Sequence, residues 1–151
     1  MSGWLVELWS IPAALGFAVL FNVPPRTLWL SCALALAGHG LRFGLVHAGS
    51  DIVLGTLVAA LLIGFCAEWW SRRARQAAPV YAVCAAIPMV PGTYMYKAVQ
   101  ALLQLASVTE ASQAQQHLVD AGYNIVKAAM ILLALAIGIA APALLWPKKG
   151  H

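Results

Sequence analysis

Five long apolar runs, separated by short polar stretches, restrict what this 151-residue chain can fold into. The chain is 62% hydrophobic and 9% charged, whereas about 25% of the residues of a soluble domain are charged. A helix needs about 20 mostly apolar residues to cross a bilayer, so five crossings use most of the chain. We therefore predict an all-α integral membrane protein with a single transmembrane domain over residues 1–151. The expected transmembrane helices are residues 4–21, 27–47, 51–70, 80–106 and 122–146.

Basic residues fall in alternate polar segments, and this alternation predicts the orientation of the chain. Lys and Arg are enriched in the short cytoplasmic loops of membrane proteins. The basic residues outside the expected helices are Arg26, Arg72, Arg73, Arg75, Lys148 and Lys149. We predict that the N-terminus lies outside the cell and the C-terminus in the cytoplasm. Because orientation accounts for most of the basic excess, no nucleic-acid partner is expected.

The sequence carries no motif that is typical of an enzyme or a metal site. It has no Gly-x-Ser-x-Gly, no HExxH and no pair of aspartates in the middle of an apolar run. Cys32, Cys66 and Cys84 lie singly inside apolar runs, where free cysteine is usually a small packing residue. We expect no disulfide, no metal, no cofactor and no enzymatic activity.

The stretch AIPMVPGTYMYKA, residues 85–97, contains features that are costly in a membrane helix. Proline inside a helix costs about 3 kcal/mol, and lysine at the bilayer centre costs about 2.5–3.5 kcal/mol. A proline also disfavours helical geometry at the residue before it. We predict that the fourth transmembrane helix is broken at Pro88–Gly92, leaving half-helices over residues 80–87 and 93–106.

A broken helix at membrane depth predicts a polar cavity. Unwound backbone is tolerated there only inside protein or beside water, and the N-terminus of a half-helix can hold an anion. Lys97 is four residues after Thr93 and therefore on the same helical face. The alternative is a proline-kinked packing helix whose Lys97 reaches the outer interface. The predicted substrate-binding residues of this segment are Pro88, Pro91, Gly92, Thr93, Tyr94 and Lys97.

The second expected helix contains AGHGLRFG, in which Arg42 follows His39 by three residues on the same face. Histidine titrates near pH 6.5, so we predict that His39 couples transport to protons. Arg42 is a candidate clamp for a substrate carboxylate. Two structural roles stay open, a hydrogen-bonded packing histidine and an arginine that reaches the outer surface. Glu7 is a candidate ion partner of the basic residues within the helices.

We expect structural roles for other residues in and beside the apolar runs. Small residues four positions apart let helices approach closely, and three such pairs are Gly40 with Gly44, Gly55 with Ala59, and Ala60 with Gly64. Asp51 is expected to cap the third helix, and Glu68 is expected at the membrane interface.

Three stretches, GFAVLFNVPPRTL, AGHGLRF and AAIPMVPGTYMYKA, together with the five-helix layout, resemble the small subunit of the threonine/serine exporter (ThrE) family. The resemblance implies a multi-pass protein of the bacterial inner membrane with a periplasmic N-terminus. It implies a two-component exporter in which the chain works with a larger partner subunit. The implied substrate is succinate for the two-subunit type, and threonine or serine for the type fused on one chain. A non-transporting assembly subunit is the remaining alternative.

Overall fold

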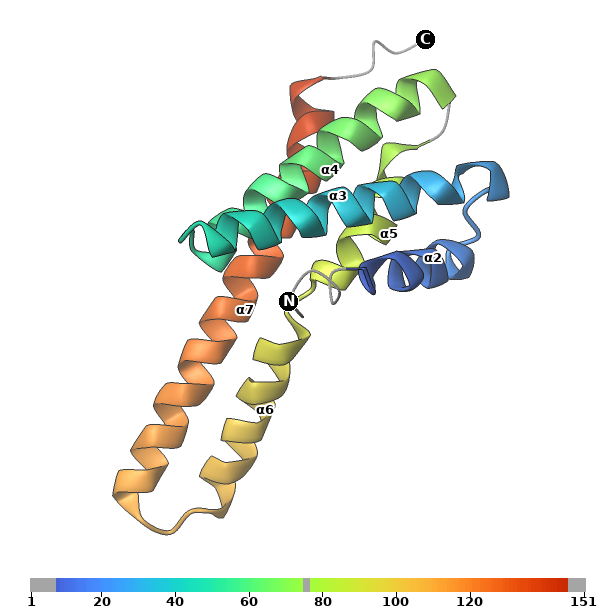
Figure 1. The fold of residues 1–151 in the computed structure, drawn as a ribbon. Helices are drawn as coiled ribbons and strands as arrows, with labels where there is room; N and C mark the ends of the chain where they lie inside the picture. The colour runs from blue at the N-terminus through green and yellow to red at the C-terminus, as the bar shows by residue number, and fades with distance from the viewer. Residues whose placement is uncertain (1–7, 75–76, 147–151) are drawn as a thin grey trace. The chain divides into compact units, whose positions relative to one another are not determined.

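The computed structural model describes residues 8–74 and 77–146, and over these residues the chain is helical with no β-strand (Figure 1). The chain divides into two compact units, one formed by residues 1–89 and 134–151 and the other by residues 90–133. The helices, with η marking 3₁₀ turns, are α2 (Ser10–Leu20), η1 (Pro25–Thr27), α3 (Leu28–His47), α4 (Ile52–Ala74), α5 (Ala78–Ala86), η2 (Ile87–Met89), α6 (Gly92–Ser107) and α7 (Ala111–Leu145).

Three described helices are long and apolar enough to cross a membrane, namely Pro25–His47, Ile52–Arg73 and Ala111–Leu145. Counting the broken pair Ala78–Met89 and Gly92–Ser107 as one crossing raises this number to four. Of the first expected helix, residues 8–21 are described, and α2 covers 11 of them. The all-helical membrane class is confirmed, whereas the number of five and the orientation stay predictions.

The core of the first unit is built mainly from alanine. Helix α3 packs against α2, α4 and α5, and α4 also packs against α5. Small side chains let helices approach closely, and such packing matters in lipid because no hydrophobic driving force brings the helices together there. The larger buried side chains include Tyr81, Ile63 and Met89. The alanines with no exposed surface are Ala14, Ala18, Ala35, Ala59, Ala60, Ala67 and Ala85.

Two helices extend into segments that the sequence predicted to be loops. Helix α4 continues through Arg72 and Arg73 to Ala74, past the expected end at Trp70. Helix α7 begins at Ala111, not at the expected Gly122. The predicted loops were wrong because Ala, Arg and Gln are strong helix formers that polarity alone does not exclude. The 35 residues of α7 span about 52 Å, well beyond a hydrocarbon core of about 30 Å.

The structure confirms one of two local predictions around α4. The Asp51 carboxylate accepts a hydrogen bond of 2.7 Å from the Val53 backbone N–H, which confirms the predicted helix cap. Glu68 is 4% exposed, and its expected position at the membrane interface stays a prediction. It pairs with Arg72 in the extension of α4 that the sequence reasoning missed.

The small-residue pair Ala60 and Gly64 packs closely against the C-terminal part of α7. A Cβ atom on Gly64 would lie 2.7 Å from the Gly138 carbonyl oxygen, and one on Gly138 would lie 2.4 Å from the Ala60 Cβ. Pro142 lies inside α7 and has no N–H for the Gly138 carbonyl four residues earlier. By contrast, a Cβ on Gly40 or Gly44 would have no atom within 4 Å, so that pair makes no close approach among the described residues.

Substitution of Gly64 by alanine tests this contact. We expect Gly64→Ala to lower the free energy of unfolding by about 1–3 kcal/mol, because the methyl group meets a backbone oxygen that cannot rotate away. The matched control is Gly40→Ala, which has open space around the new methyl group. Denaturant titration of the purified protein in detergent micelles measures both values. Equal stability of the two variants would contradict the close approach.

Candidate functional site

The predicted break of the fourth apolar segment is present, but it is shorter than expected. Helix α5 ends at Ala86, a 3₁₀ turn covers Ile87–Met89, and α6 begins at Gly92. Ile87 keeps helical geometry, with φ −53° and ψ −43°, although it precedes Pro88. The expectation that Pro88 forces its neighbour out of helical geometry was therefore wrong, because the tighter 3₁₀ turn accommodates that neighbour.

The direction of the chain changes at Pro91, not at Pro88. Pro91 has φ −78° and ψ 55°, and the Gly92 N–H donates a 2.8 Å hydrogen bond to the Val90 carbonyl. These values define an inverse γ-turn. The Pro91 carbonyl then accepts a 3.1 Å hydrogen bond from the Met95 N–H and starts α6. The Gly92 N–H, which the sequence assigned to anion binding, is therefore used within the turn.

Arg42 contacts the end of the 3₁₀ turn. In a continuous helix the Met89 carbonyl would accept a hydrogen bond from the N–H four residues later, and the break removes that donor. The Arg42 Nη1 atom donates to this carbonyl at 3.1 Å, from helix α3. The guanidinium that was predicted to bind a substrate carboxylate therefore holds a backbone oxygen of the broken segment.

His39 and Pro88 belong to the same unit as Arg42. His39 lies one turn before Arg42 on α3 and is 8% exposed. Its neighbour Gly38 packs against Ile63 of α4, since a Cβ there would lie 2.5 Å from the Ile63 Cδ1 atom. The burial of His39 fits either role that the sequence left open, so its proton-coupling role stays a prediction.

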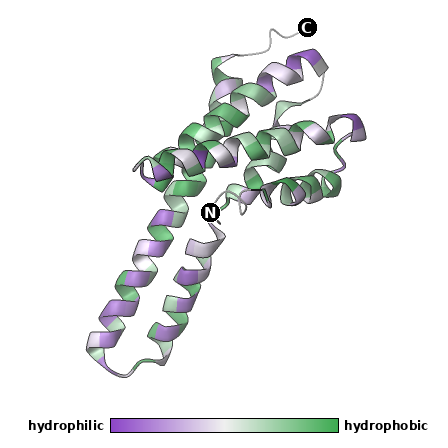
Figure 2. Ribbon diagram, in the orientation of Figure 1, coloured by the Kyte–Doolittle hydropathy of each residue, from purple (hydrophilic) through white to green (hydrophobic). Residues whose placement is uncertain are grey.

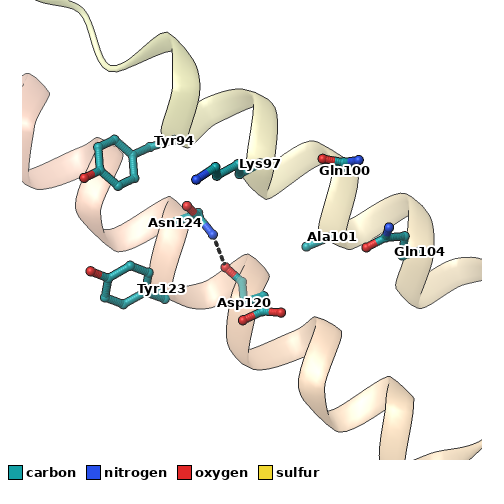
Figure 3. Close-up of a pocket in the computed structure, with 8 residues that line it drawn as sticks. All are labelled: Tyr94, Lys97, Gln100, Ala101, Gln104, Asp120, Tyr123 and Asn124. Atoms are coloured by element: carbon teal, nitrogen blue, oxygen red, sulfur yellow. Dashed lines mark hydrogen bonds between the residues drawn. The ribbon is translucent and has the colours of Figure 1, made fainter. Parts of the chain in front are cut away.

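A polar groove of about 620 Å³ lies in the second unit, between α6 and the first part of α7. These two helices run side by side, joined by a short turn (Figure 1), and hydrophilic residues recur along both (Figure 2). Predicted residues Tyr94 and Lys97 come together here. Figure 3 shows Lys97 extending from α6 toward α7, beside Tyr94 and Asn124. The lining residues are Tyr94, Lys97, Gln100, Ala101, Gln104, Asp120, Tyr123 and Asn124.

The groove lining contains one positively charged side chain and one negatively charged side chain. Lys97 is exposed and, among the described residues, has no ion-pair partner. The Asp120 carboxylate is also exposed and accepts a weak 3.4 Å hydrogen bond from the Gln116 amide. The Asn124 side chain is fixed because its amide donates to the Asp120 backbone carbonyl at 2.7 Å (Figure 3). The free ammonium and carboxylate groups can therefore bind the two ends of a small charged ligand.

Sequence reasoning missed most of the α7 side of the groove. It predicted a loop up to Asp120. The four-residue spacing of Asp120 and Asn124 was therefore not recognised as one face of a helix. On α6, Lys97, Ala101 and Gln104 follow the three-to-four-residue spacing of one helical face, a signal that was available.

Several predicted residues lie apart from the groove lining. Gly92 and Thr93 are exposed at the start of α6, whereas Pro91 is buried in the preceding turn. Glu7, the proposed ion partner, lies outside the described residues, as do three of the orientation residues, Arg75, Lys148 and Lys149.

The helices are those of an integral membrane protein, and the groove gives it a polar surface between α6 and the first part of α7. The sequence profile of the family described as "Threonine/Serine exporter, ThrE" matches residues 7–145. The chain therefore belongs to the threonine/serine exporter family, and its role is transport. No solved structure matches the chain.

The contact of Arg42 with the broken segment gives a stability prediction. We expect Arg42→Met to lower the free energy of unfolding by about 1.5–3 kcal/mol, because the Met89 carbonyl loses a charged donor. Arg42→Lys keeps a donor and should retain part of this stability, and Arg26→Gln, in an exposed turn, is the neutral control. Denaturant titration in detergent measures the three variants. Wild-type stability of Arg42→Met would show that the contact does not hold the segment.

Proposed function

We propose that this chain is one subunit of a two-component exporter that moves small carboxylate-bearing metabolites across the bacterial inner membrane. It works there as a multi-pass protein with a larger partner subunit. The observation that carries this proposal is the groove in which an unpaired Lys97 faces the same space as the Asp120 carboxylate. Lys97 is the group that binds the carboxylate of the substrate.

The presence of Asp120 favours an amino acid over a dicarboxylate. A zwitterionic amino acid presents a carboxylate to Lys97 and an ammonium group to Asp120, so both charges are matched. The hydroxyl groups of Tyr94 and Tyr123 and the nearby amides can bind a hydroxyl side chain. We therefore place threonine and serine first among the substrates. This choice agrees with the description of the family.

Succinate is the second candidate, because the resemblance implies it for the two-subunit type. Its first carboxylate would bind Lys97 in the same way. Its second carboxylate would have to use neutral donors, the amides of Gln100, Gln104 and Asn124. Repulsion by Asp120 makes this arrangement less favourable than the zwitterion.

Exposed apolar side chains are available for contact with lipid or with the proposed partner subunit. Many large apolar residues of α6 and the first part of α7 are exposed in the isolated chain, and exposed apolar patches of this kind contact lipid or protein in their native setting. They include Met95, Val99, Leu102, Leu103, Leu118 and Val126.

Transport in inside-out membrane vesicles tests the proposed function. The vesicles contain this chain alone, its larger partner alone, or both, in a background without other carriers for the substrates. We expect saturable uptake of labelled threonine and serine only with both subunits. Uptake of succinate alone would reject the amino acid assignment. Absence of uptake of all three substrates with both subunits assembled would reject the proposed function.

Substitution of Lys97 separates a binding subunit from an assembly subunit. We expect Lys97→Met to weaken substrate affinity at least about tenfold, because the carboxylate loses its charged hydrogen-bond donor. Lys97→Arg keeps the charge and should retain most of the affinity. The assembled complex is quantified by co-purification, so that loss of binding is distinguished from loss of assembly. Undiminished transport by Lys97→Met would favour the assembly role.

Substitution of Asp120 separates the two substrate classes. We expect Asp120→Asn to raise the KM for threonine at least about tenfold, because the ammonium group loses its ionic partner. Uptake of succinate, if present, should be unchanged or improved. Glu110→Gln removes another exposed carboxylate outside the groove lining and is the matched control. Equal KM values for threonine in the two variants would show that Asp120 does not bind the substrate.

A further inference from the structure

Glu68 is a buried carboxylate that does not line the groove. It lies on α4, and its residue is 4% exposed. The other acidic side chains of the described residues, Asp51, Glu110 and Asp120, are all exposed. An ionisable side chain inside a membrane-crossing helix is costly, and this cost usually marks a functional role.

Glu68 forms an ion pair with a cation that has further partners. Its Oε1 atom lies 3.2 Å from the Arg72 Nη2 atom, one helical turn away. Arg72 has other partners as well, because it donates to the Trp146 backbone carbonyl and lies 4.9 Å from the centroid of the Trp146 ring. Protonation of Glu68 would therefore not leave the Arg72 cation without a partner.

Glu68 is one of the residues that line a small cavity between α4, α5 and α7. Its volume is about 20 Å³, which is enough for one water molecule. Gly64 and Glu68 line it from α4, and the opposite walls are apolar. Those walls consist of Ala78, Pro79 and Ala82 from α5 and Ile139 and Ala143 from α7.

The charged and titratable groups around Glu68 are few. Arg72 is the cation that contacts it. On α5, the buried Tyr81 is absent from the cavity lining. On α3, Trp29 packs edge-on against Trp70 of α4, and the Cys32 thiol donates to the Ile11 carbonyl. No second titratable side chain lines the cavity, among the residues that the structure describes.

We propose that Glu68 is the proton-carrying group of this exporter, an inference that rests on the proposed transport function. A proton adds to a carboxylate oxygen of Glu68, the ion pair with Arg72 breaks, and Arg72 stays bound to the Trp146 carbonyl. The neutral carboxyl group then lies against the apolar walls from α5 and α7. On release the proton passes to water and the ion pair forms again.

Transport by the assembled complex in vesicles tests this role. We expect Glu68→Gln to keep threonine counterflow between equal concentrations within about twofold of wild type, because counterflow needs no net proton movement. The same variant should lose the stimulation of uptake by an imposed pH gradient. Glu68→Asp keeps a carboxylate and should retain part of the stimulation, and Glu110→Gln is the control at an exposed carboxylate. Full stimulation in Glu68→Gln, or its loss in His39→Gln alone, would overturn the proposal.

A second measurement does not depend on the substrate. Infrared difference spectra of the purified complex, recorded between high and low pH, report the carbonyl stretch of a protonated carboxylic acid. Exposed carboxylates contribute to this band in every variant, so the diagnostic signal is its high-frequency component, which a carboxyl group in apolar surroundings gives. We expect this component in wild type and in Glu110→Gln but not in Glu68→Gln. This result would support a proton-binding Glu68 even if the proposed substrates were not transported. A high-frequency component that persists in Glu68→Gln, or its absence in wild type, would overturn the proposal.

Discussion

The rest of the structure depends on how the chain satisfies backbone polar groups at a helix break within an apolar segment. Pro88 and Pro91 interrupt the fourth apolar run, and each freed carbonyl or N–H needs a partner where water is scarce. The structure supplies partners for two of these groups. Arg42 donates to the Met89 carbonyl from α3, and the turn at Pro91 pairs Gly92 with Val90. Because of this arrangement, α6 starts again as an independent helix.

The two compact units differ in how they are packed and in the polar groups that they present. The first unit has an alanine-rich core and the close approach of Gly64 to Gly138, which suits helices packed at short range. The second unit presents Lys97, Asp120 and several amides in one groove. Under the proposed function, a substrate with two opposite charges would use both ionic groups, whereas a dicarboxylate would use one and be repelled by the other.

The sequence predicted the broad class and the position of the break, because apolar runs and paired prolines have strong physical consequences. It also named Tyr94 and Lys97 for one polar site, but its spacing argument paired Lys97 with Thr93, which is absent from the groove lining. It did not predict the role of Arg42 at Met89, because that contact joins residues 47 positions apart. It missed Asp120, because a polar segment of strong helix formers is easily predicted as a loop when polarity is the main signal. It therefore had no reason to group Tyr123 and Asn124 with Asp120.

The most direct test of the account is substrate protection of the groove. Gln104→Cys places a thiol in the groove lining, and Ser112→Cys places an exposed thiol outside it, each in a background lacking the three native cysteines. The measurement is the rate of alkylation in the assembled complex, with and without saturating threonine. The account predicts slower alkylation at Gln104→Cys and no change at Ser112→Cys. Equal rates at Gln104→Cys with and without threonine, in a complex that transports threonine, would contradict the assignment of the groove as the substrate site.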